Sequence, residues 1–140
     1  MPPVTRAFIK ASLLYLVAAL ALALLQAAQA RVGLSIAGLS AVYFHLFLVG
    51  WVTQMIMGVG FWFFPKYSQA QPRRSERLAW LTFGLLNLGL LLRAVAEPAL
   101  AAPALAQRAL LSWALVASAL LQWLGGLLFV FNTWARIKER

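Results

Sequence analysis

The chain of 140 residues contains no cysteine, so it can form no disulfide bond, no thiolate metal site and no cysteine nucleophile. Carboxylates are nearly absent too: there are three glutamates and no aspartate, which excludes an acidic cluster for a hard metal ion. Histidine occurs once, at position 45. A binuclear metal centre built from several histidines is therefore excluded within one chain. No Ser–His–Asp arrangement and no glycine-rich phosphate loop is present, so no catalytic constellation is visible.

Apolar residues are what the sequence has in excess. They make up 64% of the chain, against about 45–50% in an ordinary soluble domain. The 12 basic and three acidic residues fall mostly between apolar runs, and a chain this short could not bury four such runs in a soluble fold. The net charge of +9 could suggest nucleic acid. We expect no nucleic-acid partner, because basic residues in the loops of a membrane protein set its topology.

The apolar runs predict an all-α membrane protein, a single four-helix domain spanning residues 1–140 in a lipid bilayer. A helix needs about 20 apolar residues to cross the hydrocarbon core. The first run resembles a signal peptide, but residues 11–28 exceed the usual apolar core of about 7–15 residues, and we expect a retained span. We expect the charged tail from Arg136 to Arg140 to be frayed. The predicted helices cover approximately residues 8–28, 42–64, 78–95 and 104–134, with Pro65 ending the second and Pro98 and Pro103 interrupting the chain after the third.

Orientation follows from the basic residues. Nine of the twelve lie at the two ends of the chain and in the middle loop, and three lie on the other side. Because cytoplasmic segments carry the excess of lysine and arginine, both termini are predicted to be cytoplasmic, in the cell inner membrane. The nine are Arg6, Lys10, Lys66, Arg73, Arg74, Arg77, Arg136, Lys138 and Arg140, and the three are Arg31, Arg93 and Arg108.

His45 lies inside the second predicted span, about one turn below the outer face. An ionisable side chain there is a functional-site hypothesis by default. At about 100° per residue, His45 heads a stripe of branched aliphatic residues. An imidazole above such a stripe suits heme, a flat apolar ligand that histidine binds at the iron. The alternative is that His45 hydrogen-bonds a neighbouring helix or lies among headgroups. The stripe continues through Val49, Val52, Ile56, Val59 and Phe63.

Arg93 lies near the outer end of the third span, at a depth similar to that of His45. Its guanidinium could bind a heme propionate through its fork of donors, with Arg31 as a second partner. It could equally contact headgroups, or pair with Glu97 four residues on. The polar residues within the spans are expected to form interhelical hydrogen bonds. These are Thr53, Gln54, Asn87 and Gln122.

The segment from His45 to Lys66 resembles the second helix of the catalytic subunit of heme–copper oxidases, most closely the nitric-oxide-reductase-like branch. The matching features are His45, Gly50, Trp51, Gly58, Phe61, Trp62, Pro65 and Lys66. The stretch from Asn87 to Arg93 is more weakly similar to small relatives of that family. The resemblance implies one four-helix arc of that subunit. It also implies that His45 is an axial ligand of a low-spin heme b.

The chain departs from that family in what it lacks. The family's catalytic subunit repeats the arc three times around a pseudo-threefold axis, and the later helices carry the copper ligands, the active-site heme ligand and the second axial ligand. The resemblance therefore implies a fold and heme, but not reduction of oxygen or nitric oxide by this chain alone. Three copies would rebuild the complete arrangement, so we expect a homotrimer, with a dimer as the alternative.

Three functions stay open at the level of sequence. The first is heme binding for heme handling, electron transfer or gas sensing. The second is a cofactor-free structural or assembly subunit, with respiratory oxidase subunits as partners. The third is a zinc or copper site formed by His45 of several protomers. If heme is bound, its sixth position is empty, is filled by Met55 or Met57, or is filled by His45 of another subunit. Helical geometry disfavours both methionines, which are rotated away from His45 and lie deeper.

Overall fold

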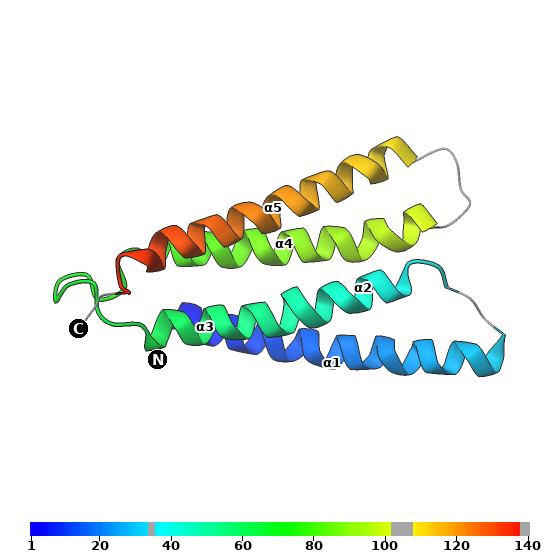
Figure 1. Cartoon of the computed structure of the whole chain (residues 1–140), viewed down its shortest axis with the longest axis horizontal. Coiled ribbons are helices and arrows are strands. Elements are labelled where there is room, and N and C mark those ends of the chain that lie inside the picture. The colour runs from blue at the N-terminus through cyan, green and yellow to red at the C-terminus, as the bar shows by residue number, and fades with distance from the viewer. Residues whose placement is uncertain (34–35, 102–107, 138–140) are drawn as a thin grey trace.

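The computed structural model describes residues 1–33, 36–101 and 108–137, and it is all-helical in that part of the chain (Figure 1). It has four helices long and apolar enough to cross a membrane, as the sequence predicts. The chain begins and α5 ends at one end of the bundle, the terminal end; α2 and α5 begin at the other, the far end (Figure 1). The elements are α1 (Pro3–Val32), α2 (Leu39–His45), the π-helix η1 (Leu46–Thr53), α3 (Gln54–Phe63), α4 (Glu76–Ala101) and α5 (Arg108–Trp134).

Helix α1 begins at Pro3, earlier than the predicted start at Phe8. Proline suits the first helical position because the N–H that it lacks would have no partner there. The helix ends at Gly33, whose φ of 70° is left-handed and whose N–H donates to the carbonyl of Gln29 at 3.1 Å. Both boundaries thus extend the predicted span, because capping residues rather than the apolar run set them.

Helices α4 and α5 also differ from the predicted ranges. Ser75 caps α4, since its hydroxyl accepts the N–H of Leu78 at 3.2 Å. The helix continues past the predicted end at Val95 and includes Pro98 near its last turn. A proline this close to the end removes one backbone hydrogen bond without breaking the helix. The predicted start of the fourth span at residue 104, and the predicted break at residue 103, lie outside the described residues.

The second span is one continuous path of three elements, α2, η1 and α3. Its end was predicted: Phe64 is extended (ψ 146°) because the following Pro65 disfavours helical geometry at that position. The π-helical segment was not predicted. Thr53 stabilises it, since its hydroxyl donates to the carbonyl of Leu48, five residues earlier, at 2.8 Å. π-Helical segments occur frequently at functional sites, and this one starts directly after His45.

The bundle consists of two helix pairs, α1 with the second span and α4 with α5 (Figure 1). Two buried clusters join the pairs. In contrast, only 11% of the most apolar window of α5 is buried, as expected for a face that contacts lipid. The first cluster contains Val4, Phe8, Met57, Phe61, Ala79 and Leu86, and the second contains Ala19, Val42, Leu46 and Leu90.

The segment after α5 is ordered at Arg136, which contradicts the prediction of a frayed tail from that residue onward. Arg136 is only 1% exposed. Its guanidinium donates to the carbonyls of Phe61 at 3.1 Å, Phe64 at 2.7 Å and Pro65 at 3.0 Å, which are the unsatisfied acceptors at the end of α3. Burial, and secondarily the charge of Arg73, lower the pKa of Arg136 from its ordinary value. Residues 138–140 lie outside the described part.

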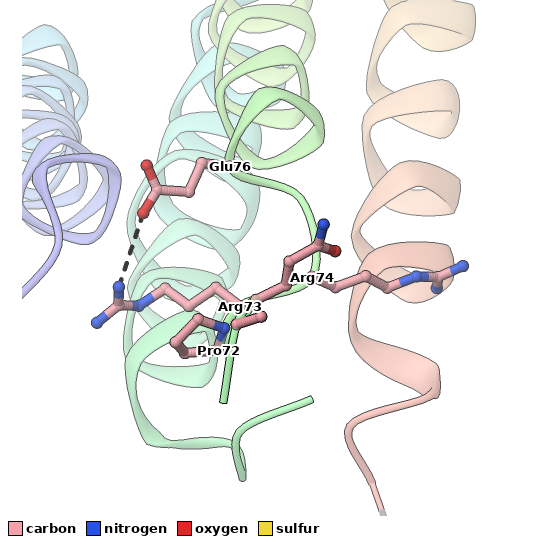
Figure 2. A pocket seen from close by; sticks show the side chains of 6 residues that line it. Pro72, Arg73, Arg74 and Glu76 are labelled. Carbon is pink, nitrogen blue, oxygen red and sulfur yellow. Dashed lines mark ion pairs between the residues drawn. The ribbon is translucent and has the colours of Figure 1, made fainter. Parts of the chain in front are cut away.

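The loop between α3 and α4 carries charge at the terminal end. Arg73 lies 3.6 Å from Glu76, and both side chains are partly or largely exposed. Figure 2 shows Arg73 pointing toward Glu76 and Arg74 pointing the opposite way, toward α5. An exposed pair of this kind adds little stability. The loop is held by its own turns and by α5, where buried Asn132 accepts from the N–H of Ser75 at 3.2 Å and donates to the Ser75 carbonyl at 2.9 Å.

Candidate functional site

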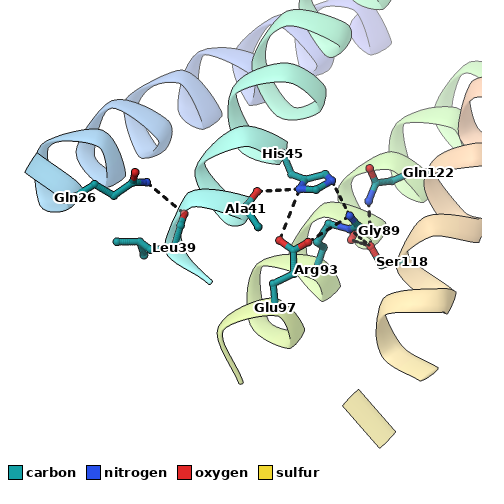
Figure 3. A network of polar contacts seen from close by, with 9 residues as sticks. All are labelled: Gln26, Leu39, Ala41, His45, Gly89, Arg93, Glu97, Ser118 and Gln122. Atoms are coloured by element: carbon teal, nitrogen blue, oxygen red, sulfur yellow. Dashed lines mark hydrogen bonds and ion pairs between the residues drawn. The ribbon is translucent and has the colours of Figure 1, made fainter. Parts of the chain in front are cut away.

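A polar cluster lies at the far end of the bundle and joins three helices (Figure 3). His45 is the last residue of α2, Arg93 and Glu97 lie one turn apart on α4, and Ser118 and Gln122 lie one turn apart on α5. We call these five residues the far-end polar cluster. The structure therefore brings together His45 and Arg93, the two residues that the sequence placed at the same depth. It also adds partners that the sequence did not link to them.

Both ring nitrogens of His45 have partners. Nδ1 lies 2.8 Å from the carbonyl oxygen of Ala41 and 3.6 Å from Oε2 of Glu97. Nε2 lies 2.6 Å from a terminal guanidinium nitrogen of Arg93. A guanidinium only donates, so Nε2 must accept and the proton of the neutral ring is on Nδ1. The ring is thus held in the tautomer in which Nε2 carries the free electron pair.

Arg93 connects His45 to α5. Its Nε donates to the hydroxyl of Ser118 at 3.3 Å, and its terminal nitrogen lies 3.3 Å from Oε1 of Glu97. Ser118 is fully buried; it donates to the carbonyl of Gly89 at 2.7 Å and also accepts from Gln122 at 3.0 Å. The predicted pair of Arg93 with Glu97 is confirmed. The opposite charges of Arg93 and Glu97 offset each other within the cluster.

One carboxylate oxygen of Glu97 in the cluster lacks a hydrogen-bond donor. Oε2 of Glu97 is buried and has no hydrogen-bond partner, although Nδ1 of His45 lies 3.6 Å away. A buried carboxylate oxygen without a donor is costly. The nearest donor to this oxygen is Nδ1 of His45, which is already within hydrogen-bond distance of the Ala41 carbonyl.

Two glycines allow the helices to approach closely around the cluster. Gly38, at a φ of 77°, starts α2, and a Cβ there would lie 3.0 Å from the carbonyl oxygen of Glu97. On the other side, a Cβ on Gly89 would lie 2.9 Å from the backbone oxygen of Ser118. Any larger residue would separate α2 or α5 from α4. The glycines therefore fix the distances across which His45, Arg93 and Ser118 meet.

The aliphatic stripe below His45 is not continuous in the structure. Val49 packs against both buried clusters, whereas Ile56 is 63% exposed and Val52 is partly exposed. The π-helical segment causes the difference, because a rotation of about 100° per residue holds only in an α-helix. Val59 and Phe63, at 40% and 78% exposed, continue the face of Ile56.

The other residues considered as heme contacts lie outside the cluster. Arg31 is exposed in the last turn of α1. Met57 is buried in the first core cluster, and the sulfur of Met55 accepts a weak hydrogen bond from Ser12 at 3.8 Å. Both methionines are thus engaged inside the bundle, which agrees with the geometric argument against them as ligands.

Within the span, Asn87 joins three helices. Its side-chain oxygen accepts from the Tyr15 hydroxyl at 2.9 Å, and its amide nitrogen donates to Gln54 at 3.1 Å. The prediction of interhelical hydrogen bonds is confirmed for Asn87 and Gln54. It is wrong for Thr53, which bonds its own helix, while Gln122 reaches α4 only through Ser118.

Replacing Asn87 with leucine should destabilise the bundle by about 1–2 kcal/mol, because Tyr15 and Gln54 would lose their partner in an apolar environment. Unfolding in mixed detergent measures the change. In the Asn87→Leu background, Tyr15→Phe should then have almost no further effect, since the hydroxyl is already unpaired. Additive effects of the two substitutions would show that the contact contributes nothing.

The cluster contains two side chains of the kinds that bind metal ions, His45 and Glu97. Among the described residues, no three histidine, cysteine, aspartate or glutamate side chains come together. What the cluster does offer is one oriented imidazole, a guanidinium that binds carboxylates, and an exposed apolar face along the same span.

These features define an all-helical protein, in the described part of the chain, with four helices long and apolar enough to cross a membrane and a polar cluster centred on one histidine. No protein-family model, curated protein or solved structure matches the chain.

Proposed function

We propose that the protein binds heme b, with Nε2 of His45 as the iron ligand. The observation that carries the proposal is the orientation of the ring: Nδ1 lies at hydrogen-bond distance from the Ala41 carbonyl and near Glu97, so Nε2 is the atom that would bind iron, in place of its contact with Arg93. Metal-binding histidines usually donate their other N–H to a backbone carbonyl or a carboxylate in this way. The resemblance of residues 45–66 to a heme-binding helix supports the same assignment.

Arg93 would bind the propionates of the heme. Its guanidinium already contacts the ring nitrogen and the carboxylate of Glu97, and Arg–carboxylate pairs form with two parallel hydrogen bonds. In the absence of iron, the same guanidinium donates to Nε2 of His45. Arg31 is the second candidate partner of the propionates, since it lies in the last turn of α1, at the far end of the bundle.

The apolar surface for the porphyrin would come from Val52 and Ile56, which retain exposed area on the second span. Bound heme would supply one-electron transfer or gas binding. With one histidine per chain, the sixth position is open to a small gas or is filled by His45 of another subunit.

Hemin titration of the purified protein in detergent tests the proposal. We expect a sharp Soret band that saturates near one hemin per chain, or per two chains if two histidines share an iron. A high-spin spectrum would indicate five-coordinate iron, and a low-spin spectrum the shared site. If the spectrum stays that of hemin in empty detergent micelles, the proposal is wrong.

Cofactor-free assembly with respiratory oxidase subunits is the second candidate, and one observation favours it. In the structure the polar groups of the cluster bond to one another: Arg93 donates to Ser118, and Ser118 donates to the Gly89 carbonyl. Nε2 of His45 already accepts a hydrogen bond from Arg93. A zinc or copper site would need His45 from several protomers, since one chain offers no ligand set within the described residues. Elemental analysis of a colourless protein separates these two cases, since zinc or copper would support the metal site and a metal-free protein the cofactor-free subunit.

A homotrimer is the expected assembly. Gly84 on α4 and Gly126 on α5 have no atom within 4 Å of where a Cβ would stand, so each helix presents an unpartnered small-residue position. Native mass spectrometry in mild detergent should give three times the 15.4 kDa chain mass. A dimer would point to the His45-bridged alternative, and a stable monomer would contradict both.

We infer that the terminal end faces the cytoplasm of the cell inner membrane, because most basic residues lie there. The chain has no cysteine, so single cysteines can be introduced at exposed positions. An impermeant maleimide should label Ala101→Cys in intact spheroplasts and Ala70→Cys only after lysis. Labelling of both from the same side would contradict the four-span topology, and the reverse pattern would invert the orientation.

A further inference from the structure

A groove of about 560 Å³ opens at the terminal end, between the loop before α4 and the last turns of α5. Its walls are almost entirely apolar, and its one charged member is Arg74. Trp134 is 73% exposed at its edge, and exposed tryptophans favour the level of the lipid headgroups. The lining residues are Arg74, Leu127, Val130, Phe131, Trp134 and Ala135.

Arg74 also lines a second, polar pocket of about 260 Å³ on the loop side, with Arg73 and Glu76 (Figure 2). One arginine thus separates a polar pocket from an apolar groove. Its backbone has a φ of 63°, an uncommon conformation for a residue with a side chain. The conformation turns the side chain across to α5, where its guanidinium stacks 4.3 Å above the ring of Phe131 and donates to the Phe131 carbonyl.

Among the described residues, Arg74 has no carboxylate partner. Arg73 pairs with Glu76 at 3.6 Å, whereas none of the described carboxylates lies within ion-pair distance of Arg74. Lys66 in the same loop and Arg77 in the first turn of α4 add two further positive charges at this end of the bundle. The positive charge is thus concentrated where the apolar groove meets the membrane surface.

We propose that this groove binds an anionic phospholipid, with the phosphate at Arg74 and an acyl chain along Leu127 and Val130. The combination of a cation and an adjoining apolar groove matches a lipid in which a phosphate is joined to a hydrocarbon chain. Basic pockets at the cytoplasmic ends of membrane helices recognise such lipids. A free phosphate would use the guanidinium alone and leave the groove unused.

Native mass spectrometry with equimolar phosphatidylglycerol and phosphatidylcholine of identical chains tests the proposal. Wild type should retain phosphatidylglycerol about fivefold more, the factor expected for one basic residue at an anionic surface. Arg74→Gln should remove that preference. Arg77→Gln, which deletes the same charge from the adjoining first turn of α4 outside the groove, should keep it. Equal losses in the two variants, or no preference in wild type, would overturn the proposal.

Two further arms separate a lipid from a free anion and guard against misfolding of Arg74→Gln. Val130→Trp fills the groove while leaving Arg74 in place, and it should reduce retention of long-chain phosphatidylglycerol several-fold. Millimolar inorganic phosphate should displace none of the lipid. Displacement by phosphate, or unchanged retention in Val130→Trp, would show an anion site without a lipid groove and overturn the proposal.

Discussion

His45→Gly is expected to abolish the Soret band of the hemin-loaded protein, and added imidazole is expected to restore it. The substitution removes the proposed iron ligand and leaves a space of the size of the lost ring. Free imidazole can enter that space and bind the iron, while Arg93 and Glu97 keep their own pair. The expected change is complete loss of the band and recovery of most of it at millimolar imidazole.

Ala41→Gly is the matched control for that experiment. It lies one turn earlier in α2, carries a helix cost of about 1 kcal/mol, which is larger than that of His45→Gly, and leaves the backbone carbonyl that faces Nδ1 in place. It should retain the full band. If both variants lose it, unfolding of α2 explains the loss; if His45→Gly keeps it, His45 is not the ligand.

Arg136→Ala should lower the free energy of unfolding by about 3 kcal/mol, because a charged donor to three carbonyls would be lost. Those carbonyls, of Phe61, Phe64 and Pro65, are the open acceptors at the end of α3, and Arg136 joins them to the segment after α5. No nearby residue can replace a side chain that is 1% exposed. Unfolding in mixed detergent measures the difference.

Arg77→Ala is its control, since Arg77 is an exposed arginine at the same end of the bundle. An exposed substitution of this kind should stay within about 0.5 kcal/mol of wild type. Equal destabilisation by the two substitutions would contradict the anchoring role of Arg136.

The four helices could be predicted because apolar runs of spanning length have few alternatives in a chain this short. Their ends could not, because they depend on single residues. Pro3 starts α1 well before the apolar run, and Pro98 is tolerated within α4. The prediction of a frayed tail failed at Arg136 because a charged residue near a terminus can bond to carbonyls far away in sequence.

The similar depth of His45 and Arg93 followed from counting residues in antiparallel spans, whereas the direct contact between them was not predicted. The role of Ser118 could not be predicted, because a single serine in an apolar helix does not show which helix it faces. The structure shows its partner: the hydroxyl donates to the Gly89 carbonyl of α4 at 2.7 Å. The stripe through Val49 and Ile56 assumed α-helical winding, and the π-helical segment directed Val49 into the core instead. The hydrophobic periodicity of a sequence does not show where a helix changes from α-helical to π-helical geometry.

Pulsed electron paramagnetic resonance of the ferric, hemin-loaded protein tests the central claim most directly. The chain has one histidine, so growth on ¹⁵N-histidine labels one imidazole and nothing else. If Nε2 of His45 binds the iron, the nitrogen hyperfine signals of the axial ligand will change from ¹⁴N to ¹⁵N frequencies on labelling. A spectrum that is identical with and without the label would mean that His45 is not bound to the iron, and it would contradict the account.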